Sequence, residues 1–402
     1  MSKKIMILGA SILQLPAIQK AKEMGLQIIA VDMNPDAIGF KEKGVIKEVI
    51  STIDIPSVVE CAKKHNIDGV MTLASDMPMR TVAAVSKELG LVGITEETAL
   101  KATNKACMRE ALKKEGVPIP EFYKVSNRDE YNEAAAKFNV PFIVKPADNS
   151  GSRGIIKIED ITNKKLIFEA YNYSKSSSRN GDVVVEEYMN GPEVSVETLT
   201  LNGECHVIQI TDKITTGAPH FVEMGHTQPS QLDDETKLKI SEVAKMANKA
   251  VGITNGPSHT EIIVTKDGPK IVELGARLGG DCITTHLVPL STGVDMVECC
   301  IKIALGEVPD VNIKFCKGSA IRYLTCDAGK IESIIGIDDA KANAGIRQIS
   351  IVHNIGDNVS EIKSSTDRVG FIVAQADNAS KAGICCINAM SNIKIKVSRR
   401  EN

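Results

Sequence analysis

The spacing of hydrophobic residues predicts alternating strands and helices in the first quarter of the chain. Short apolar runs end at Gly9 and Asp32, and apolar side chains three to four positions apart lie between them. The runs are typical of buried strands, and the wider spacing is typical of helices that cover a sheet. The expected elements are strands over 3–9, 27–31 and 69–73 and helices over 14–24 and 56–65. This alternation indicates a small doubly wound parallel sheet that extends to about residue 94.

Beyond this sheet the pattern changes to longer helices, a hairpin and turn-rich segments. A helix is expected over 96–115, because a glycine and a proline follow it closely. A second helix is expected over 234–251, where one face is apolar. Lys-Asp-Gly-Pro joins two strand patterns at 260–265 and 270–274, which is a strong hairpin signal. Turn-rich segments, the second a candidate mobile loop, lie at 146–154 and 174–181.

These elements predict a mixed α/β and α+β protein of three domains. A Rossmann-like domain with a parallel sheet is expected over 1–95, a central domain over 96–310 and a C-terminal α+β subdomain over 311–402. A smaller lid subdomain is expected within the central domain, at about 120–190.

The composition describes a folded protein and disfavours several classes of function. The chain has 402 residues, of which 43% are hydrophobic and 25% charged, so it can bury a substantial core. The net charge is −3 with both signs well mixed, and no basic stripe indicates a nucleic-acid partner. No stretch approaches the roughly 20 apolar residues that a membrane span requires. Ten irregularly spaced cysteines, without a C-x-x-C pair, favour reduced thiols in a cytoplasmic protein.

The first strand-to-helix turn bears on dinucleotide binding. Gly9 ends the first strand and Asp32 ends the second, a spacing that suits a ribose-binding acid. The turn reads Gly-Ala-Ser-Ile-Leu-Gln, so the second and third glycines of the G-x-G-x-x-G fingerprint are missing. An NAD-dependent oxidoreductase is therefore disfavoured, and a Rossmann-like sheet without a cofactor is favoured.

Residues suited to a nucleoside triphosphate follow one another through the central domain. Lys105 lies in the helix after the first domain, and Lys145 ends a strand, so both can offer a cation to phosphates. The segment at 149–154 can surround a phosphate with backbone N–H groups without side-chain clashes. Its candidate cofactor residues are Ser150, Gly151, Ser152 and Gly154. Each feature alone is more often a surface lysine or an ordinary turn, so the argument depends on their order.

A nucleotide hinge and paired carboxylates complete this constellation. The apolar strand that leads into 186–189 can present main-chain groups to adenine, and Glu193 can accept the ribose hydroxyls. Glu261 and Glu273 lie one on each strand of the predicted hairpin, and two carboxylates plus phosphates are a natural ligand set for magnesium. Arg277 can neutralise charge on a transferring phosphoryl group or an acyl phosphate. A solvated ion pair on a surface hairpin is the alternative interpretation.

In this order the motifs resemble the ATP-grasp superfamily over roughly residues 3–310. The resemblance is strongest to carboxylate–amine ligases, which include bacterial L-amino-acid ligases, and extends to carbamoyl-phosphate synthase large chains. It implies an ATP-grasp fold in which Lys105 and Lys145 hold the ATP phosphates under the 149–154 loop. It implies that adenine is bound by Glu186, Glu187, Tyr188 and Met189, and ribose by Glu193. It also implies that Glu261 and Glu273 bridge two Mg²⁺ ions, for which Mn²⁺ is an alternative, with Arg277 beside the acyl phosphate.

One position departs from the family pattern. The family often reads Glu-x-Asn-x-Arg, where the asparagine completes a metal site, but this chain has Gly275 at that place. The second magnesium is then expected to be held by water or more loosely. For the same reason, a non-catalytic ATP-binding sensor remains a rival hypothesis.

Candidate substrate residues lie between the hinge and the hairpin, and just after the hairpin. His226 can orient a substrate or relay a proton near neutral pH. Gly279 and Gly280 can form a small anion pocket, and Asp281 can bind an ammonium group. Ser230 and Arg322 complete the set. A structural histidine, a tight turn and a surface salt bridge are the competing interpretations.

The predicted reaction is ATP-dependent amide formation. Transfer of the γ-phosphoryl group to a carboxylate gives an acyl phosphate, which an amine attacks to release the amide, ADP and phosphate. The substrates are expected to be a small carboxylate and a small amine, with two amino acids as one option, and the enzyme a homodimer. The alternatives are a carboxylase-like or purine-biosynthetic ATP-grasp enzyme that activates bicarbonate or formate, and the ATP sensor.

Overall fold

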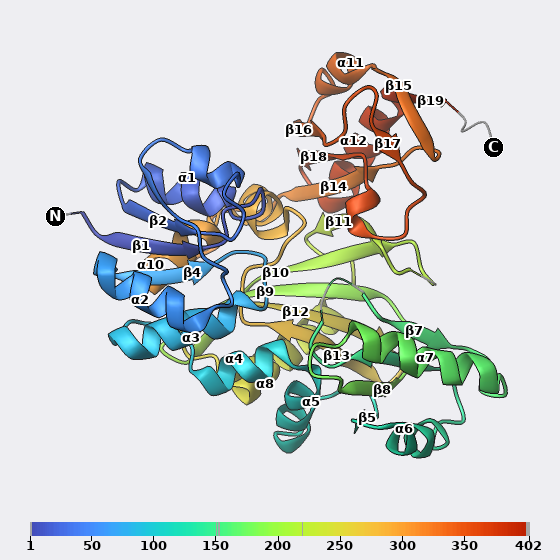
Figure 1. Ribbon diagram of the computed structural model, residues 1–402. Helices are drawn as coiled ribbons and strands as arrows, with labels where there is room; N and C mark the ends of the chain where they lie inside the picture. Colours follow the sequence, from blue (N-terminus) through green and yellow to red (C-terminus); the bar gives the residue numbers. More distant parts are fainter. Residues whose placement is uncertain (1, 150, 152, 219, 399–402) are drawn as a thin grey trace.

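The computed structural model describes residues 2–149, 151, 153–218 and 220–398. Within these residues the strands form four sheets, of which the N-terminal one is parallel and the other three are antiparallel. Figure 1 shows the N-terminal sheet and the small sheet of the central region beside one long sheet, which continues into the C-terminal region. The predicted mixed α/β and α+β fold class is confirmed.

The N-terminal sheet has the strand order β3-β2-β1-β4 and is covered by helices on both faces. Its strands are β1 (Lys4–Leu8), β2 (Gln27–Val31), β3 (Val45–Glu48) and β4 (Gly69–Thr72). Alternate residues of a strand point to opposite faces, so Ile5 and Ile7 pack on one helix layer and Met6 and Leu8 on the other. The layers are α1 (Leu15–Glu23) with α10 (Met296–Ala304), and α2 (Ile55–His65) with α3 (Pro78–Leu89).

The turn after β1 is filled by a side chain of its own. The Gln14 amide donates to the Leu73 carbonyl at 2.6 Å, and a Cβ added to Gly9 would lie only 2.7 Å from the Gln14 side chain. The Asp32 carboxylate accepts a hydrogen bond from the Ala10 N–H at 2.8 Å. The space where a dinucleotide would approach this turn is therefore occupied, in keeping with the incomplete glycine pattern.

The single helix predicted over 96–115 is wrong, because the chain forms two helices here. These are α4 (Glu96–Thr103) and α5 (Lys105–Lys114), separated at Asn104, which has an extended backbone with φ −132° and ψ 112°. The Asn104 side chain caps α5 by accepting a hydrogen bond from the Cys107 N–H. The break puts Lys105 in the first turn of α5, where its side chain can turn toward the hairpin.

A small antiparallel sheet follows, in the strand order β5-β8-β6-β7. Its strands are β5 (Phe122–Val125), β6 (Phe142–Pro146), β7 (Ile156–Ile158) and β8 (Val183–Glu187), and its helices are α6 (Arg128–Ala135) and α7 (Lys164–Ser177). The mobile loop predicted at 174–181 is wrong for its first half, which is the last turn of α7. The Asp148 carboxylate fixes the second half by accepting hydrogen bonds from the Arg179 and Asn180 N–H groups.

The long sheet has eight strands in the order β13-β12-β9-β10-β11-β14-β18-β16. The first five in chain order are β9 (Glu193–Leu201), β10 (Glu204–Thr215), β11 (Glu223–Gln228), β12 (Gly256–Thr265) and β13 (Gly268–Gly275). The last three are β14 (Gly318–Leu324), β16 (Ile346–Ile351) and β18 (Gly370–Ala376). Helix α8 (Asp234–Val251) lies at the predicted position and packs on the part of the sheet formed by β13, β12, β9 and β10. Since β11 pairs with β14, the sheet continues without a break past residue 310.

The C-terminal region adds helices and a third antiparallel sheet. Helix α12 (Ala379–Asn392) packs on β14 and β18, and α11 (Ile337–Lys341) lies beside it. The sheet consists of β15 (Gly329–Ile335), β17 (Asn358–Val359) and β19 (Lys394–Ser398). A π-helical turn (Ile283–Leu287) and α9 (Val288–Thr292) lead from the hairpin toward this region. Among the described residues, no helix has both the length and the apolar character to cross a membrane.

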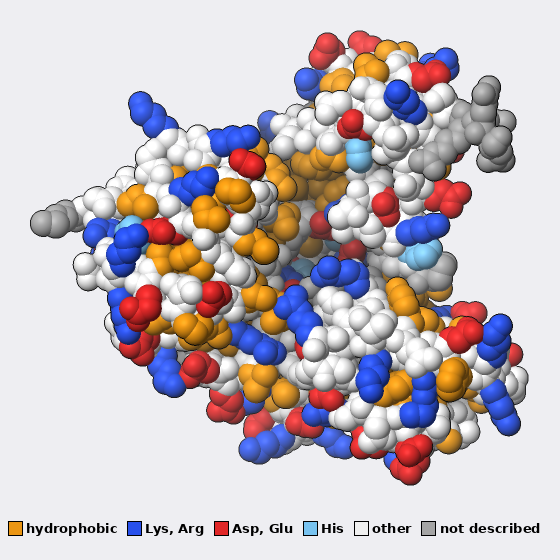
Figure 2. All heavy atoms as spheres, viewed as in Figure 1, with side chains coloured by type: hydrophobic (Ala, Val, Ile, Leu, Met, Phe, Trp, Pro, Cys, Tyr) orange, Lys and Arg blue, Asp and Glu red, His pale blue; other side chains and the backbone are white. Residues whose placement is uncertain are grey.

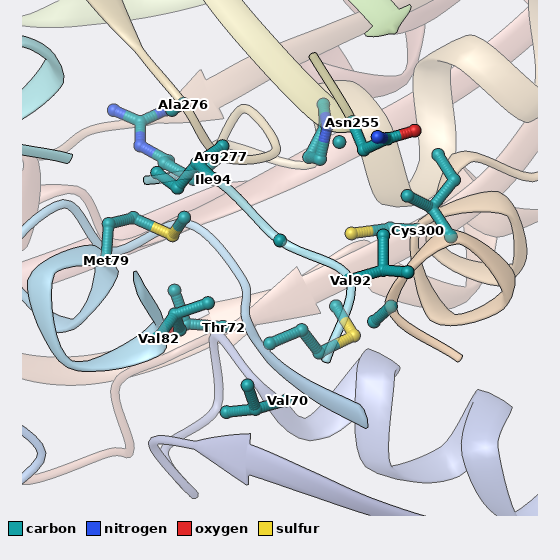
Figure 3. Close-up of a pocket in the computed structure, with 16 residues that line it drawn as sticks. Val70, Thr72, Met79, Val82, Val92, Ile94, Asn255, Ala276, Arg277 and Cys300 are labelled. Atoms are coloured by element: carbon teal, nitrogen blue, oxygen red, sulfur yellow. The ribbon is translucent and has the colours of Figure 1, made fainter. Parts of the chain in front are cut away.

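A small apolar pocket of about 40 Å³ lies where the N-terminal sheet meets the end of the β12–β13 hairpin and α10. Figure 3 shows side chains from these elements around it, among them Val70, Val82 and Cys300. The pocket is far too small for a nucleotide and is a gap in the packing between the two regions.

Candidate active site

A cleft of about 650 Å³ opens between the N-terminal sheet, the small sheet and the long sheet. Figure 2 shows the molecule hollowed here, with hydrophobic side chains on the upper wall and charged side chains deeper in the hollow. Most of the residues predicted from sequence line it. They are Lys105, Lys145, Gly151, Glu186, Glu187, Tyr188, Met189, Glu193, His226, Glu261, Glu273, Arg277, Gly280 and Asp281.

The other predicted residues lie elsewhere or outside the described residues. Ser150 and Ser152 lie outside the described residues. Ser230 is buried and donates its hydroxyl hydrogen bond to Asp212, and Arg322 donates to the His226 carbonyl at 2.9 Å from behind the strand. Within the described residues, these two do not line the cleft, nor do Gly154 and Gly279.

Lys105 connects the start of α5 to the hairpin. Its Nζ lies 2.7 Å from Glu273 Oε1 and donates to the Asn149 carbonyl at 2.6 Å, and the side chain is 8% exposed. The backbone N–H of Lys105 donates to the Ala147 carbonyl. A cation predicted for phosphate and a carboxylate predicted for metal are thus paired with each other.

Glu186, on β8, holds two buried cations. Arg109 donates to both of its carboxylate oxygens at 2.7 and 3.1 Å, and Lys145 Nζ lies 2.6 Å away. Burial opposes ionisation of Glu186, but Arg109 and Lys145 outweigh it and lower its pKa to about 2. Burial also lowers the pKa of Lys145. The sequence interpretation missed Arg109, although its place four residues after Lys105 puts both on one side of α5.

The chain segment after Glu186 forms one wall of the cleft. The N–H groups of Glu187 and Tyr188 donate to the backbone carbonyls of Glu121 and Pro141, at 2.9 and 3.0 Å. These two donors are therefore already engaged, and Tyr188 and Met189 contribute their side chains or carbonyl groups to the cleft.

A buried lysine that the sequence interpretation missed joins three carboxylates. Lys213, on β10, lies 2.9 Å from Glu261, 2.5 Å from Glu193 and 3.7 Å from Glu223, and its side chain is 3% exposed. Burial opposes its charge, but the three carboxylates raise its pKa well above the usual value. Lys213 in turn holds the pKa of Glu261 well below its usual range against the effect of burial. Lys213 follows Asp212 in a strand with several other polar residues, so the sequence offered no signal for it.

A buried histidine–carboxylate pair lies next to Glu261. His259 Nδ1 donates to Glu197 Oε1 at 2.6 Å, and Nε2 lies 3.6 Å from Glu261 Oε1. Burial opposes protonation of His259, but Glu197 outweighs it and raises the pKa to about 9. The sequence interpretation assigned no role to either residue.

Arg277 reaches across to the segment that follows β4 of the N-terminal sheet. Its Nε donates to Asp76 Oδ1 at 2.7 Å, and Asp76 lies after β4 at the cleft wall. Gly275 makes room for this pair, because a Cβ there would lie 3.0 Å from Asp76 Oδ1 and 3.2 Å from Arg277 Nε. Asp76 was not predicted, since nothing in the sequence links it to a residue some 200 positions away.

The far end of the cleft holds Asp281 and His226. Arg368 donates to both Asp281 oxygens at 2.8 and 2.9 Å, and His226 Nε2 lies 3.4 Å from the same carboxylate. Asp281 and Cys282 both have left-handed backbones, with φ 51° and 61°. Two successive non-glycine residues in this conformation store strain, which is found most often at functional sites.

The donor set of the cleft fits a hard divalent cation. Glu261 and Glu273 are direct cross-strand partners on the hairpin, and both line the cleft. Each of the two carboxylates contacts a lysine ammonium group, so both already have a positive charge beside them. Carboxylates together with phosphates are the ligands that Mg²⁺ and Mn²⁺ prefer.

Comparison with known proteins identifies this architecture. Residues 138–285 match the model of the ATP-grasp domain, and residues 322–398 match L-amino acid ligase C-terminal domain 2. The chain is 30% identical over 341 residues to the uncharacterized protein y4rH of Sinorhizobium fredii, which covers 84% of this chain and 70% of that protein. It is 29% identical to the L-arginine-specific L-amino acid ligase of Bacillus subtilis, over 69% of this chain and 68% of the relative.

The fold leads to the same family. The crystal structure of an L-amino acid ligase from Bacillus licheniformis aligns with a TM-score of 0.85 at 22% identity, over 99% of both chains. The chain belongs to the ATP-grasp superfamily, whose members use ATP with Mg²⁺ or Mn²⁺. Within that superfamily it is an ATP-dependent carboxylate–amine ligase that forms C–N bonds, as the sequence motifs predicted.

Proposed function

We propose that this ligase joins two amino acids, activating the carboxylate of one and coupling it to the amine of the other. The match of residues 322–398 to an L-amino acid ligase C-terminal domain supports this substrate class. So does the name of the Bacillus subtilis relative, which is an L-arginine-specific L-amino acid ligase. The shared chemistry is an α-carboxylate activated as its acyl phosphate and an α-amine that displaces the phosphate.

The observation that carries the ATP-dependent activation step is the pairing of cations with carboxylates in one cleft. Lys105 is paired with Glu273, and Lys213 with Glu261 and Glu193. An ATP–metal complex brings an anion to the lysines and a cation to the carboxylates. Each buried charge therefore exchanges one partner for another, and none is left unpaired, which would be costly.

Each group then has a role in binding and transfer. Lys105 and Lys145 hold the phosphates, Glu193 accepts the ribose hydroxyls, and Gly151 belongs to the covering loop with Ser150, Ser152 and Gly154. Glu187, Tyr188 and Met189 line the adenine pocket, while Glu186 acts through Arg109 and Lys145. Glu261 and Glu273 would hold up to two divalent ions, which neutralise charge on the phosphates when bound.

The acyl-transfer end follows from the charges there. Arg277, held by Asp76, neutralises the acyl phosphate as the carboxylate attacks the γ-phosphoryl group and ADP leaves. His226 can take a proton from the attacking amine, and phosphate then departs from the acyl carbon. Gly280 and Asp281 shape the substrate pocket, and Arg368 neutralises Asp281, so a substrate ammonium would have to share that carboxylate. Gly279, Ser230 and Arg322 act from behind the wall by supporting it.

The proposal includes the remaining organisation of the enzyme. It has a domain boundary near residue 95 and another near 310, a lid at about 120–190, and a homodimeric, cytoplasmic state. Sedimentation at two protein concentrations tests the dimer, and a single species of monomer mass would contradict it.

The test of the reaction is phosphate release from ATP and magnesium across a panel of amino acids, singly and in pairs. We expect release that needs a particular pair, with an amide-linked product found by mass spectrometry. Glu273→Gln, which keeps the shape but removes a metal-binding charge, should release none. Glu204→Gln, an exposed glutamate at the start of β10, is the matched control and should be fully active. Clear ATP binding with no pair-dependent release would refute the amino-acid substrates.

A further inference from the structure

His259 faces the position that Gly275 leaves without a side chain. On the hairpin, Glu261 pairs with Glu273, and the neighbouring cross-strand pair on the same face is His259 with Gly275. All four residues line the cleft. The two carboxylates are therefore followed along the hairpin by a pair in which only the histidine offers a ligand atom.

The histidine is held by a carboxylate that has no other cation partner among the described residues. Glu197 is fully buried, and its Oε1 accepts the Nδ1–H of His259 at 2.6 Å. Gly279 packs against the pair, since a Cβ there would lie 2.7 Å from His259 Nδ1 and 2.8 Å from Glu197 Oε2. This arrangement fixes the ring and places Nε2 on the side of Glu261, at the cleft. A carboxylate on one imidazole nitrogen is the usual support of a histidine whose other nitrogen binds a metal.

His259 and Glu261 are too far apart for a hydrogen bond but close to the spacing of two ligands of one ion. Nε2 and Glu261 Oε1 are 3.6 Å apart, which is too long for a hydrogen bond. Two ligands at about 2.1 Å from one octahedral ion lie roughly 3.0 Å apart when adjacent and roughly 4.2 Å apart when opposite. The observed spacing is roughly 0.6 Å longer than that of adjacent ligands, and a small side-chain rotation would bring both atoms to one ion.

We propose that His259 Nε2 is a third protein ligand of the active-site metal, beside Glu261 and Glu273, in place of the oxygen that Gly275 lacks. The proposal rests on the metal-dependent ATP site of the proposed function. A nitrogen ligand changes the preferred ion. Mg²⁺ prefers sites made of oxygen ligands alone, whereas first-row divalent ions such as Mn²⁺ also accept imidazole beside carboxylates. A site with one nitrogen ligand therefore binds these ions more tightly than it binds Mg²⁺. The site is therefore expected to bind Mn²⁺ more tightly than Mg²⁺.

Electron spin-echo measurements on Mn²⁺ test the ligand directly. The full-length protein is loaded with Mn²⁺ and ADP, once at natural nitrogen abundance and once with ¹⁵N-histidine. We expect a nitrogen coupling to Mn²⁺ whose frequency changes on histidine labelling, which separates it from any adenine nitrogen. If the wild-type protein shows no histidine coupling, or binds no Mn²⁺ with ADP, the proposal is wrong.

Two variants assign the coupling to one residue. His259→Gln should abolish it, and His226→Gln, which removes the other described histidine of the cleft wall, should leave it unchanged. If His259→Gln does not fold, persistence of the coupling in His226→Gln still assigns it, and its loss there would overturn the proposal. Glu197→Gln should weaken Mn²⁺ binding by about 10- to 100-fold and Mg²⁺ binding less. None of these measurements needs an amino acid, so they succeed or fail independently of the substrate assignment.

Discussion

Arg109 and Glu186 form a two-pronged ion pair that is almost completely buried beneath the nucleotide cleft. Arg109 is 1% and Glu186 3% exposed, and Arg109 also donates to the Val272 carbonyl at 2.8 Å. The pair joins α5 to β8 and β13, three elements that carry the predicted phosphate, adenine and metal residues. The floor of the site is therefore held by a contact between protein side chains from three elements.

Removal of this arginine should cost stability before it affects chemistry. Arg109→Met leaves Glu186 buried with Lys145 as its remaining cation, and loss of one partner of a buried pair typically costs about 3–5 kcal/mol. We expect a loss of this size in the free energy of unfolding, measured by urea titration. Lys114→Met, the same kind of change at an exposed position of the same helix, should stay within about 0.5 kcal/mol. Equal effects of the two variants would contradict this role of the pair.

Gly275 predicts a loss of kcat without a matching change in the KM for ATP. In Gly275→Ala the new Cβ would press on the Asp76–Arg277 pair, and no backbone strain arises because this glycine is not left-handed. Displacement of Arg277 by a few tenths of an ångström should lower kcat by about tenfold, while overpacking costs about 1–3 kcal/mol. The KM for ATP should change little, since the phosphates are expected to contact Lys105 and Lys145.

The matched control for this substitution is another glycine of the cleft. In Gly280→Ala the Cβ would meet Ala74 at 3.6 Å, an ordinary contact. We therefore expect Gly280→Ala to keep a free energy of unfolding within about 0.5 kcal/mol of the wild type, without the overpacking cost of Gly275→Ala. A Gly275→Ala enzyme with unchanged kcat would show that Arg277 is not positioned through Asp76.

The order of the elements and the site residues that belong to motifs could be predicted from the sequence. The motifs include Lys105, Lys145, Glu261 and Glu273, because a triphosphate and a metal require charges, which the chain offers on a helix, at a strand end and on a hairpin. Partners that meet only in three dimensions carry no such signal. Asp76 approaches Arg277 from the end of the N-terminal sheet, and Lys213 lies in a strand with no neighbouring motif. The break at Asn104 was hidden because helical residues flank it on both sides.

The raised pKa of His259 predicts a loss of stability at alkaline pH in the metal-free protein. Its pKa is about 9 in the folded state against 6.5 as the ordinary value. A group whose folded pKa is raised stabilises the protein fully below the unfolded value and loses that contribution as pH rises through the folded value. Between pH 7 and 10 the expected loss is about 2–3 kcal/mol at about 1.36 kcal/mol per pH unit.

Urea titrations across this pH range in the presence of a chelator measure the loss. Lysines, tyrosines and cysteines also titrate here, so the informative quantity is the difference between variants. His259→Gln should show a smaller decline than the wild type, whereas His226→Gln should decline with the wild type. Parallel curves for the wild type and His259→Gln would mean that Glu197 does not hold a proton on this ring.

The apolar pocket between the N-terminal domain and the hairpin should accept one more methylene group. The pocket has about 40 Å³ of free volume, and Val82 reaches it from α3 (Figure 3). Val82→Ile should raise the free energy of unfolding by about 0.5–1 kcal/mol, because a buried methylene contributes roughly 0.8 kcal/mol. Val85→Ile on the same helix is the control, since Val85 is fully buried and does not line the pocket. There the extra group has no free volume and should cost about 1 kcal/mol or more.

Urea midpoints with unchanged m values would establish both signs, and a destabilised Val82→Ile would show that the gap closes only by strain. Arg277 lines this pocket as well as the cleft, so unchanged ligase activity in Val82→Ile would show that the two regions can be packed more tightly without moving the arginine.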